Sequence, residues 1–421
     1  MTQSTKPLTP KLFRRQVLDA ARNGEPATPL CRHAPPLDFC GGCTFQDRSY
    51  AAQVAAKQAA LRALWQNDLP AEMLAQLVMV GSPEPFAYRT RMDYVASKGR
   101  FGLRRGGKFN YIVDLQECHL IPSAAFATAR GVFEHAVALG LPDYNLHTHA
   151  GFLRYLVVRR SPQDTLLLAL VTSAPDHAGQ QAALVQQLAV AALKEPGVVG
   201  FHWLVNDTVT DISFGTPQHH WGADLLEMQV AGHTLAIGPN TFFQNNVYLL
   251  VPLLDDVLAA VCSGEEATYQ HYTVADLYGG VGTIALHLAA HVGHVTCVES
   301  FAESAALGAR NVIANGAGNV RMVGADVLEW LREQAPGALD VVVADPPRAG
   351  MGPEVCAELL RLHPRRLVYV SCNALTQLED TRALAPGYHM RALRGYDMFP
   401  QTAHMEALAV FERIEEGTRN T

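Results

Sequence analysis

A cysteine stands two residues after a short apolar run near the end of this 421-residue sequence. The run Leu367–Val370 is rich in β-forming residues, and three small polar side chains, Ser371 to Asn373, then interrupt it. We predict that Cys372 stands at the carboxyl end of a strand, the edge at which open α/β sheets bind ligands. A thiolate there is a nucleophile, whereas a cysteine inside a strand is usually an apolar filler. The filler interpretation fits the other three cysteines of this half, Cys262, Cys297 and Cys356.

Three strand ends upstream have residues that could bind a ligand. In ADLYGGVGTIALHLA, Gly279, Gly280 and Gly282 lie between an apolar strand and a helix, where the backbone can approach a ligand closely. Glycines also serve ordinary turns, so the loop alone is weak evidence. Glu299 ends the next apolar run, where a carboxylate can accept both ribose hydroxyls of an adenosine ligand, and Asp326 stands at the strand end after it, where it could meet the adenine. Together these positions predict a binding site for a ligand that contains adenosine.

The fourth strand end separates two cofactors that would fit such a site, NAD and S-adenosylmethionine. In LDVVVADPPRAGM, Asp345 and two prolines follow an apolar run. They would hold a carboxylate and rigid carbonyls where a transferring methyl group would lie, and a dehydrogenase has no use for them. A plain Pro-Pro turn is the alternative. The pattern favours S-adenosylmethionine.

A methyl donor beside a thiolate fits the chemistry of a pyrimidine. Carbon 5 of the ring is a poor nucleophile, but a thiolate added to carbon 6 makes an enolate whose carbon 5 can attack a sulfonium methyl. A base must then remove the proton from carbon 5. In DMFPQTAHMEALAVFER, Glu406 enters the last apolar strand with His404 two positions before it, and apolar neighbours would raise its pKa to suit proton abstraction. An ordinary strand-edge charge is the alternative interpretation of Glu406.

Five segments in order resemble the motifs of the RNA uracil-C5 methyltransferases, which make 5-methyluridine: FFQNN, DLYGGVGT, ADPPRAGM, SCNALTQLED and FPQTAHMEAL. The resemblance implies a Rossmann-like class I methyltransferase domain of α/β type, mostly parallel with an antiparallel final strand. It implies that Cys372 is the nucleophile and Glu406 the base. It further implies that six residues contact S-adenosylmethionine: Gln244, Tyr278, Thr283, Glu299, Asp326 and Asp345. At Gly279 the family usually has a cysteine, a difference that should leave the turn intact.

Four more cysteines lie in the N-terminal part. Cys31, Cys40 and Cys43 occur as C-x8-C-G-G-C, and Cys118 follows in LQECHLIP. This spacing indicates a zinc or an iron–sulfur site, with a redox pair as a weaker option. The resemblance implies a [4Fe–4S] cluster on these four cysteines, because many family members have one with a CGGC-x-x-Q stretch like CGGCTFQ here. The first spacing is longer than the commonest family pattern. We expect a folding or RNA-docking role for the cluster, since the methyl transfer is redox-neutral.

The elements that must position these residues fall into three parts. Residues 1–30 read as a tail with one helix around 11–23. Residues 31–235 read as an α+β, sheet-rich domain for the cluster and for RNA, with a helical segment at 48–69 and another in AGQQAALVQQLAVAALKE. From 236 to 421 strand and helix alternate, which predicts the methyltransferase domain and its parallel sheet.

RNA contact is predicted from a local excess of basic residues in a chain of net charge −7. Between Phe86 and Lys108 there are seven Lys or Arg residues and one acid, and four aromatic residues are interleaved: Phe86, Tyr88, Tyr94 and Phe101. Arg154, Arg159 and Arg160 would extend this surface. A solvated basic sheet face is an equally good interpretation. A uracil inside folded RNA must leave its stack to meet Cys372, so we expect a flipped base.

The resemblance favours 23S ribosomal RNA as the expected substrate. SCNA with DMFP-x-TAH resembles the ribosomal type that lacks an N-terminal TRAM barrel; transfer RNA is the second candidate, because some cluster-bearing relatives methylate it. Methylation of an exocyclic amine, with Cys372 idle, and a non-catalytic RNA-binding scaffold are the rival functions. The sequence has no signal peptide and no apolar stretch of membrane-spanning length, so we expect a cytoplasmic monomer without a membrane partner.

Overall fold

The chain divides into two compact units. The computed structural model describes residues 8–35, 39–175, 178–263 and 269–415. The C-terminal unit draws its residues from Met1–Pro26, Arg48–Pro83 and Tyr248–Thr421, and the central unit comprises Ala27–Asp47 and Glu84–Val247. None of the helices in the part of the chain that the structure describes is long and apolar enough to cross a membrane.

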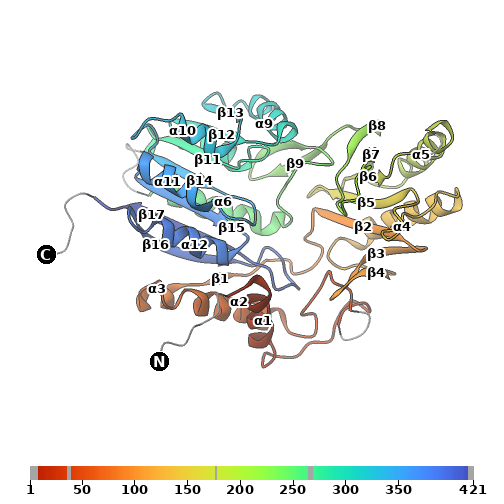
Figure 1. Cartoon of the computed structure of the whole chain (residues 1–421), viewed down its shortest axis with the longest axis horizontal. Coiled ribbons are helices and arrows are strands. Elements are labelled where there is room, and N and C mark those ends of the chain that lie inside the picture. The colour runs from red at the N-terminus through yellow and green to blue at the C-terminus, as the bar shows by residue number, and fades with distance from the viewer. Residues whose placement is uncertain (1–7, 36–38, 176–177, 264–268, 416–421) are drawn as a thin grey trace. The chain divides into compact units, whose positions relative to one another are not determined.

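An eight-stranded sheet forms the middle of the C-terminal unit (Figure 1). Its order is β1-β16-β17-β15-β14-β11-β12-β13, and the strands from β15 to β13 are parallel. β17 is antiparallel to both of its neighbours, as predicted for the last strand. The bounds are β1 Met79–Val80, β11 Thr273–Leu277, β12 His294–Glu299, β13 Val320–Gly324, β14 Val341–Ala344, β15 Arg366–Ser371, β16 Tyr388–Tyr396 and β17 Glu406–Arg413.

Helices alternate with these strands, as the sequence predicts for a parallel sheet. Every residue of β14 is buried, so its VVVA sequence reads as a continuous apolar run rather than an alternating one. The helices of this half are α6 Val247–Val261, α8 Thr283–Ala289, α9 Ala302–Ala314, α10 Val327–Arg332, α11 Gly352–Leu362 and α12 Ala374–Leu384. The carboxyl ends of the parallel strands therefore share one edge of the sheet.

The N-terminal helices α1 Pro10–Ala21 and α2 Tyr50–Trp65 belong to the same unit, together with α3 Ala71–Gln76. Leu61 and Trp65 of α2 are fully buried, and β1 extends the sheet by pairing with β16. The compact units are thus discontinuous in sequence and differ from the continuous predicted ranges 31–235 and 236–421. The apolar face of α2 is visible in the sequence, but part of what it packs against, around Gly395, lies more than 300 residues away, which local patterns do not reveal.

A seven-stranded mixed sheet forms the central unit, in the order β4-β3-β2-β5-β6-β7-β8. All of its pairs are antiparallel except β6–β7, which α5 Ala178–Ala192 connects. The remaining helix is α4 Ser123–Ala138, and β9 Leu226–Val230 forms a hairpin with β10 His233–Ile237. The sheet strands are β2 Arg91–Ser97, β3 Arg100–Arg105, β4 Lys108–Asp114, β5 Leu153–Arg160, β6 Leu166–Thr172, β7 Val198–Val205 and β8 Thr216–Gly222. The predicted sheet-rich character is confirmed.

Candidate active site

The glycine turn after β11 is held by the glutamate at the end of β12. Gly280 and Gly282 have φ values of 56° and 88°, in the left-handed region that glycine adopts without steric cost. Glu299 Oε2 accepts a hydrogen bond from the Gly280 backbone N–H at 3.0 Å, and Oε1 accepts one from Phe301 at 2.6 Å. Each carboxylate oxygen retains a further lone pair, so Glu299 can still accept hydrogen bonds from a ligand.

Tyr278 and Asp326 lie near each other at this edge. Burial and the Asp326 charge raise the pKa of Tyr278 to about 12. Asp326 is also the N-cap of α10, where its Oδ1 accepts from the backbone N–H of Leu328 at 2.9 Å and of Glu329 at 3.2 Å. A structural role therefore accounts for this aspartate, and its contact with adenine stays a prediction. Thr283 is the first residue of α8.

Asp276, inside β11, is an acidic residue that the sequence analysis missed. It is fully buried, and its Oδ2 accepts from Ala285 N at 3.0 Å and from Cys297 Sγ at 3.5 Å. Burial raises the pKa of Asp276 to about 7, opposed by those two hydrogen bonds and reinforced by the charges of Asp345 and Glu299. Its neighbours in the sequence are apolar and offered no signal of a carboxylate at the site.

The nucleophile and base proposed from the sequence are brought to adjacent strands. Ser371, the last residue of β15, pairs with Ala407 across the antiparallel β15–β17 ladder, so Cys372, which directly follows the strand, lies beside Glu406. Burial raises the pKa of Cys372 to about 11, and the charges of Glu406 and Asp345 act in the same direction. Cys372 is half-buried, while Cys297 and Cys356 are buried in the filler role expected for them.

Glu406 lies in an environment that disfavours its charge. It is 2% exposed, and its Oε2 has no hydrogen-bond partner among the described residues. Burial raises the pKa of Glu406 well above its usual value, and the Asp345 charge adds to the effect. The raised pKa expected from its apolar neighbours is present. His404 is exposed and packs edge-on against Phe399 at 6.2 Å between ring centroids.

Arg348 is a second residue that the sequence analysis did not single out, although it stands in the ADPPRAGM motif. Its side chain hydrogen bonds with the Cys372 thiol and its charge lowers the pKa of that thiol, opposing burial. Asn373 links the segment after β15 to the segment after β14, because its Nδ2 donates to the Arg348 carbonyl at 2.8 Å. Its Oδ1 also caps α12 by accepting from Leu375 N. The asparagine beside the cysteine is therefore explained by capping and by this link.

Gln244 lies in the central unit, between β10 and α6. Its backbone carbonyl accepts a hydrogen bond from Thr90 Oγ1 at 3.0 Å. Its contact with S-adenosylmethionine stays a prediction.

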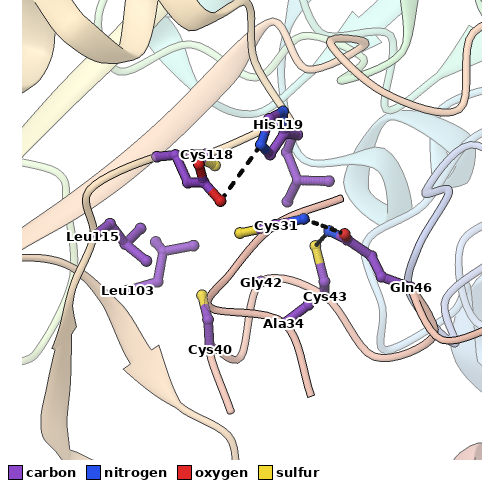
Figure 2. Close-up of a pocket in the computed structure, with 12 residues that line it drawn as sticks. Cys31, Ala34, Cys40, Gly42, Cys43, Gln46, Leu103, Leu115, Cys118 and His119 are labelled. Atoms are coloured by element: carbon purple, nitrogen blue, oxygen red, sulfur yellow. Dashed lines mark hydrogen bonds and ion pairs between the residues drawn. The ribbon is translucent and has the colours of Figure 1, made fainter. Parts of the chain in front are cut away.

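The four N-terminal cysteines line one small pocket in the central unit (Figure 2). Leu103, Leu115 and Leu120 contribute apolar walls to the cavity. Burial raises the pKa of all four thiols, to about 11 for Cys31 and about 12 for Cys43, and each thiol is also subject to the charges of nearby groups. The charge of Arg89 lowers the pKa of Cys43 and Cys118.

Gln46 and the two glycines of the CGGC stretch hold the chain in place around the cysteines. Gln46 donates from Nε2 to Cys43 Sγ at 3.2 Å and accepts from Cys31 N at 3.0 Å, so one side chain links two of the cysteines. A Cβ at Gly41 would lie 2.7 Å from the Arg104 carbonyl, and one at Gly42 would lie 2.7 Å from Leu103 Cδ1. Within the described ranges, no three His, Cys, Asp or Glu side chains are arranged to hold a single metal ion.

The predicted RNA surface needs correction. Tyr88, Tyr94 and Phe101 are fully buried and belong to the core, where the rings of Tyr94 and Phe101 lie 4.9 Å apart. The arginines expected to extend the surface are buried too: Arg154, Arg159 and Arg160 lie on β5, which is buried along its whole length. Arg154 and Arg159 donate to backbone carbonyls there. Those residues cannot face phosphates, and that part of the prediction is wrong.

Exposed aromatic side chains lie instead along and beside the β3–β4 hairpin. Phe109 is 59% exposed, and Tyr111 and Phe39 are also exposed. The guanidinium of Arg104 stands 4.0 Å from the centroid of Phe109, and that of Arg100 stands 4.7 Å from Tyr111. We call Phe39, Arg100, Arg104, Arg105, Phe109 and Tyr111 the hairpin surface.

Comparison with known proteins adds an independent observation. The family model described as tRNA (uracil-5-)-methyltransferase matches residues 226–414. An uncharacterized RNA methyltransferase of Nitratidesulfovibrio vulgaris is 32% identical over 401 residues, which are 92% of this chain and 83% of that protein. The tRNA (uracil(54)-C(5))-methyltransferase of Pyrococcus horikoshii is 30% identical over 376 residues, 88% of this chain and 83% of that one. The crystal structure of the Pyrococcus abyssi tRNA (uracil-54, C5)-methyltransferase with S-adenosyl-L-homocysteine superimposes with a TM-score of 0.71 at 28% identity, covering 89% of this chain and 86% of that chain.

Proposed function

Because this chain belongs to the tRNA (uracil-5-)-methyltransferase family, we propose that it methylates carbon 5 of a uridine in RNA, with Cys372 as nucleophile and Glu406 as base. Bound S-adenosylmethionine supplies an electrophilic methyl group. The donor residues we propose are Gln244, Tyr278, Thr283, Glu299, Asp326 and Asp345.

The chain's own side chains have separate roles in this reaction. The Cys372 thiol gives its proton to solvent, and Arg348 stabilises the resulting thiolate. Sγ then bonds to carbon 6 of the uracil as the electron pair of the ring double bond moves to form the enolate. Carbon 5 then gains the methyl group as the donor's sulfur–methyl bond breaks. The Glu406 carboxylate takes the proton from carbon 5, and the bond between Sγ and carbon 6 breaks to release the methylated base and the thiolate.

The observation that carries the proposal is the shared environment of three side chains. The charges of Glu406 and Asp345 both act on the Cys372 thiol, and the charge of Asp345 also acts on Glu406. A thiol, a buried carboxyl with an unpartnered oxygen and the aspartate that follows β14 thus adjoin one another at one edge of a methyltransferase-type sheet. An N-methylating enzyme would have no use for the thiol or the buried glutamate.

Two variants test this chemistry with labelled S-adenosylmethionine and RNA from a strain that lacks the gene. Cys372→Ala should abolish turnover and every covalent enzyme–RNA adduct. Glu406→Gln should form a methylated adduct that survives denaturation but resolves slowly. Cys262→Ala, which removes another half-buried cysteine of the same unit, is the matched control and should behave as wild type.

Each rival function predicts a different result. Full turnover by Cys372→Ala would favour methylation of an exocyclic amine. No methyl incorporation by the wild-type protein into any RNA fraction of that strain would favour a scaffold without activity.

For the target we propose 23S ribosomal RNA, on the resemblance of SCNA and DMFP-x-TAH to the ribosomal type. Transfer RNA is the second candidate, favoured by the relatives named as tRNA (uracil(54)-C(5))-methyltransferases. Mass spectrometry of both RNA classes from the deletion strain separates the two. A missing 5-methyluridine in a ribosomal fragment supports the first, and one missing from transfer RNA overturns it.

We also propose that Cys31, Cys40, Cys43 and Cys118 hold a [4Fe–4S] cluster. Four sulfur donors around an apolar cavity fit the group chemically. Zinc on the same thiolates is the alternative, and the resemblance of CGGCTFQ to the family's CGGC-x-x-Q stretch favours the cluster. The positive charge of Arg89 beside Cys43 and Cys118 suits a thiolate-bound cluster, which is negatively charged overall.

Anaerobic purification tests the cluster. About four irons and four acid-labile sulfides per chain are expected, and Cys40→Ser should lower both while Cys262→Ala leaves both unchanged. Stoichiometric zinc without iron, or a disulfide between these cysteines in the isolated protein, would contradict the assignment.

RNA docking is the remaining part of the proposal. The hairpin surface combines exposed rings with the guanidinium groups of Arg100 and Arg105, which stand 4.7 Å and 5.6 Å from the centroid of Tyr111, and this combination stacks bases and neutralises phosphates. The guanidinium of Arg104 is already paired with Asp211. We assign the RNA-facing role to this surface in place of the buried aromatic residues Tyr88, Tyr94 and Phe101.

A further inference from the structure

A nine-residue loop, 397–405, connects β16 to β17 and ends at Glu406. The residues that flank it, Tyr396 and Glu406, pair with each other across the two strands. Glu406 directly follows the loop, so the contacts that hold the loop also border the start of β17. The position of the Glu406 carboxyl therefore depends on what holds the loop.

One of the holding contacts is a fully buried ion pair with α2. Lys57 Nζ donates to Asp397 Oδ1 and, at 3.2 Å, to the carbonyl of Phe399, and both charged side chains are 0% exposed. Burial lowers the pKa of Lys57, opposed by Asp397. Burying two charges costs free energy that their attraction only partly offsets, so apolar residues of similar size would often be as stable here. Stability alone is a poor reason for the pair.

A second contact comes from the preceding turn of the same helix. Gln53 Nε2 donates to Gln401 Oε1 at 2.9 Å, and the Gln401 backbone N–H donates to Gln53 Oε1 at 3.1 Å. Gln401 has a φ of 67°, a left-handed conformation that is unfavourable for a residue with a side chain. The paired hydrogen bonds fix the loop in that conformation. Residues four apart on a helix share a face, so α2 presents Gln53 and Lys57 to the loop together.

We propose that Gln53 and Lys57 are positioning residues that hold the loop 397–405 and thereby aim the Glu406 carboxyl at the proton of carbon 5. The inference rests on the proposed function, since it assigns a role toward that base. Proton removal comes after thiolate addition and methyl transfer. Loosening the loop should therefore slow the release of the methylated RNA and leave the earlier bond-forming steps largely intact.

Two variants test the inference without leaving a buried charge unpaired. Lys57→Met together with Asp397→Leu removes the ion pair and keeps an apolar filling of similar size, and Gln53→Ala removes the contacts to Gln401. Each should lower turnover, by about 100-fold for a displacement near 1 Å, while a denaturation-resistant RNA adduct with a labelled methyl group accumulates. Thermal unfolding of each variant shows whether the fold is retained.

Arg62→Met is the matched control on the same helix. Arg62 donates to the carbonyls of Ala75 and Leu77, at the end of α3, and not to the loop. This variant should lose stability without accumulating the adduct. A structural role for Gln53 and Lys57 would make their variants resemble it, and that result would overturn the inference.

Parallel assays of Cys372→Ala and Glu406→Gln distinguish a failure of the positioning role from a failure of the proposed function. If Glu406→Gln accumulates the adduct and the α2 variants turn over normally, or lose activity without an adduct, only the positioning role is wrong. If Glu406→Gln forms no adduct or Cys372→Ala remains active, the proposed function and this inference both fail.

Discussion

At the residue scale, the Cys372 thiol is held in its uncharged form more strongly than a reactive cysteine usually is. Burial raises its pKa to about 11, and Arg348 is the group that opposes this. At neutral pH the free enzyme therefore has little thiolate, and the rate of attack should rise with pH through the neutral range. The proposed nucleophile thus has a neighbour that favours its thiolate, Arg348.

Arg348→Met should raise the pKa of Cys372 further. Each additional unit leaves about tenfold less thiolate at a given pH, so alkylation of Cys372 by iodoacetamide at pH 8 should slow accordingly. Mass spectrometry of the Cys372 peptide measures the rate, with the Cys262 peptide as an internal reference. Arg348→Lys keeps the charge and should fall between the two. An unchanged rate in Arg348→Met would mean that the guanidinium does not stabilise the thiolate.

The protonation state of Glu406 should affect the free energy of unfolding, and the direction of this effect follows from its raised pKa. Its pKa is raised in the folded protein, so its contribution to the free energy of unfolding is complete below the ordinary value of 4.5 and is lost as pH rises through the folded value. Glu406→Gln has no charge to bury. Its stability relative to wild type should therefore increase from pH 5 to pH 8 in urea unfolding, while activity is lost. A difference that does not change with pH would contradict the burial argument.

Gly279 is explained by a sulfur atom from the next strand. A Cβ at this position would lie 2.1 Å from Cys297 Sγ and 2.9 Å from Asp276 Oδ2. Where the family usually has a cysteine, this chain has a glycine and fills the space with Cys297. The family difference could be seen in the sequence, but its compensation could not, because the two residues meet only across β11 and β12.

Gly279→Ala should destabilise the protein by about 1–3 kcal/mol, the usual cost of overpacking. Adding Cys297→Ala should recover much of the loss, because it removes the atom that the new methyl group would contact. Urea unfolding of the two single variants and the double variant gives the coupling. Additive losses would show that the clash relaxes elsewhere.

At the element scale, the sequence was informative where function and strand ends coincide. Cys372, Asp345 and Glu299 each end an apolar run or follow one directly, so their edge of the sheet could be predicted from alternation alone. The attachment of α2 to the C-terminal unit could not be predicted, because its buried polar residues Gln53 and Lys57 bond to residues about 340 positions later. Nothing local distinguishes such a lysine from a solvated one.

The basic segment 86–108 illustrates the opposite failure. Alternating basic and aromatic residues look like a nucleic-acid surface, but in the strand β2 and next to it the rings point into the core. The alternation of side chains along a strand shows which residues share a face, but which face is buried depends on what packs against the sheet. Only Phe109, Tyr111 and Phe39 around the hairpin remain exposed enough to stack on bases.

Replacing Phe109 and Tyr111 together by alanine should therefore weaken RNA binding. Stacking is worth about 1–3 kcal/mol per base, which corresponds to roughly 5- to 150-fold in the dissociation constant for each base lost. Filter binding at fixed salt measures the change. Val190→Ala, at an exposed position of α5 in the same unit, is the control. Equal affinities for the double variant and this control would remove the hairpin surface from the RNA interface.

At the scale of the whole molecule, the residues proposed for methyl transfer and the four N-terminal cysteines lie in different compact units. The thiol, the base and the strand-end carboxylates belong to the C-terminal unit, and the four-cysteine cavity belongs to the central unit. Methyl transfer needs no electron, so a cluster in the central unit is best understood as a structural element. Without the proposed cluster, four cysteines and the linking Gln46 line a pocket with apolar walls.

Loss of the cluster should therefore loosen the central unit locally and spare the methyltransferase sheet. In Cys40→Ser, amide hydrogen exchange is expected to rise across Phe39–Asp47 and around Cys118, where the cysteines and Gln46 are linked, and to stay at the wild-type level in β11, β14 and β15. Mass spectrometry of peptides from the full-length protein measures both regions at once. If exchange rises equally in the sheet, the two units are not energetically separate; if it rises nowhere, the cavity is stable without a metal and the cluster has no folding role.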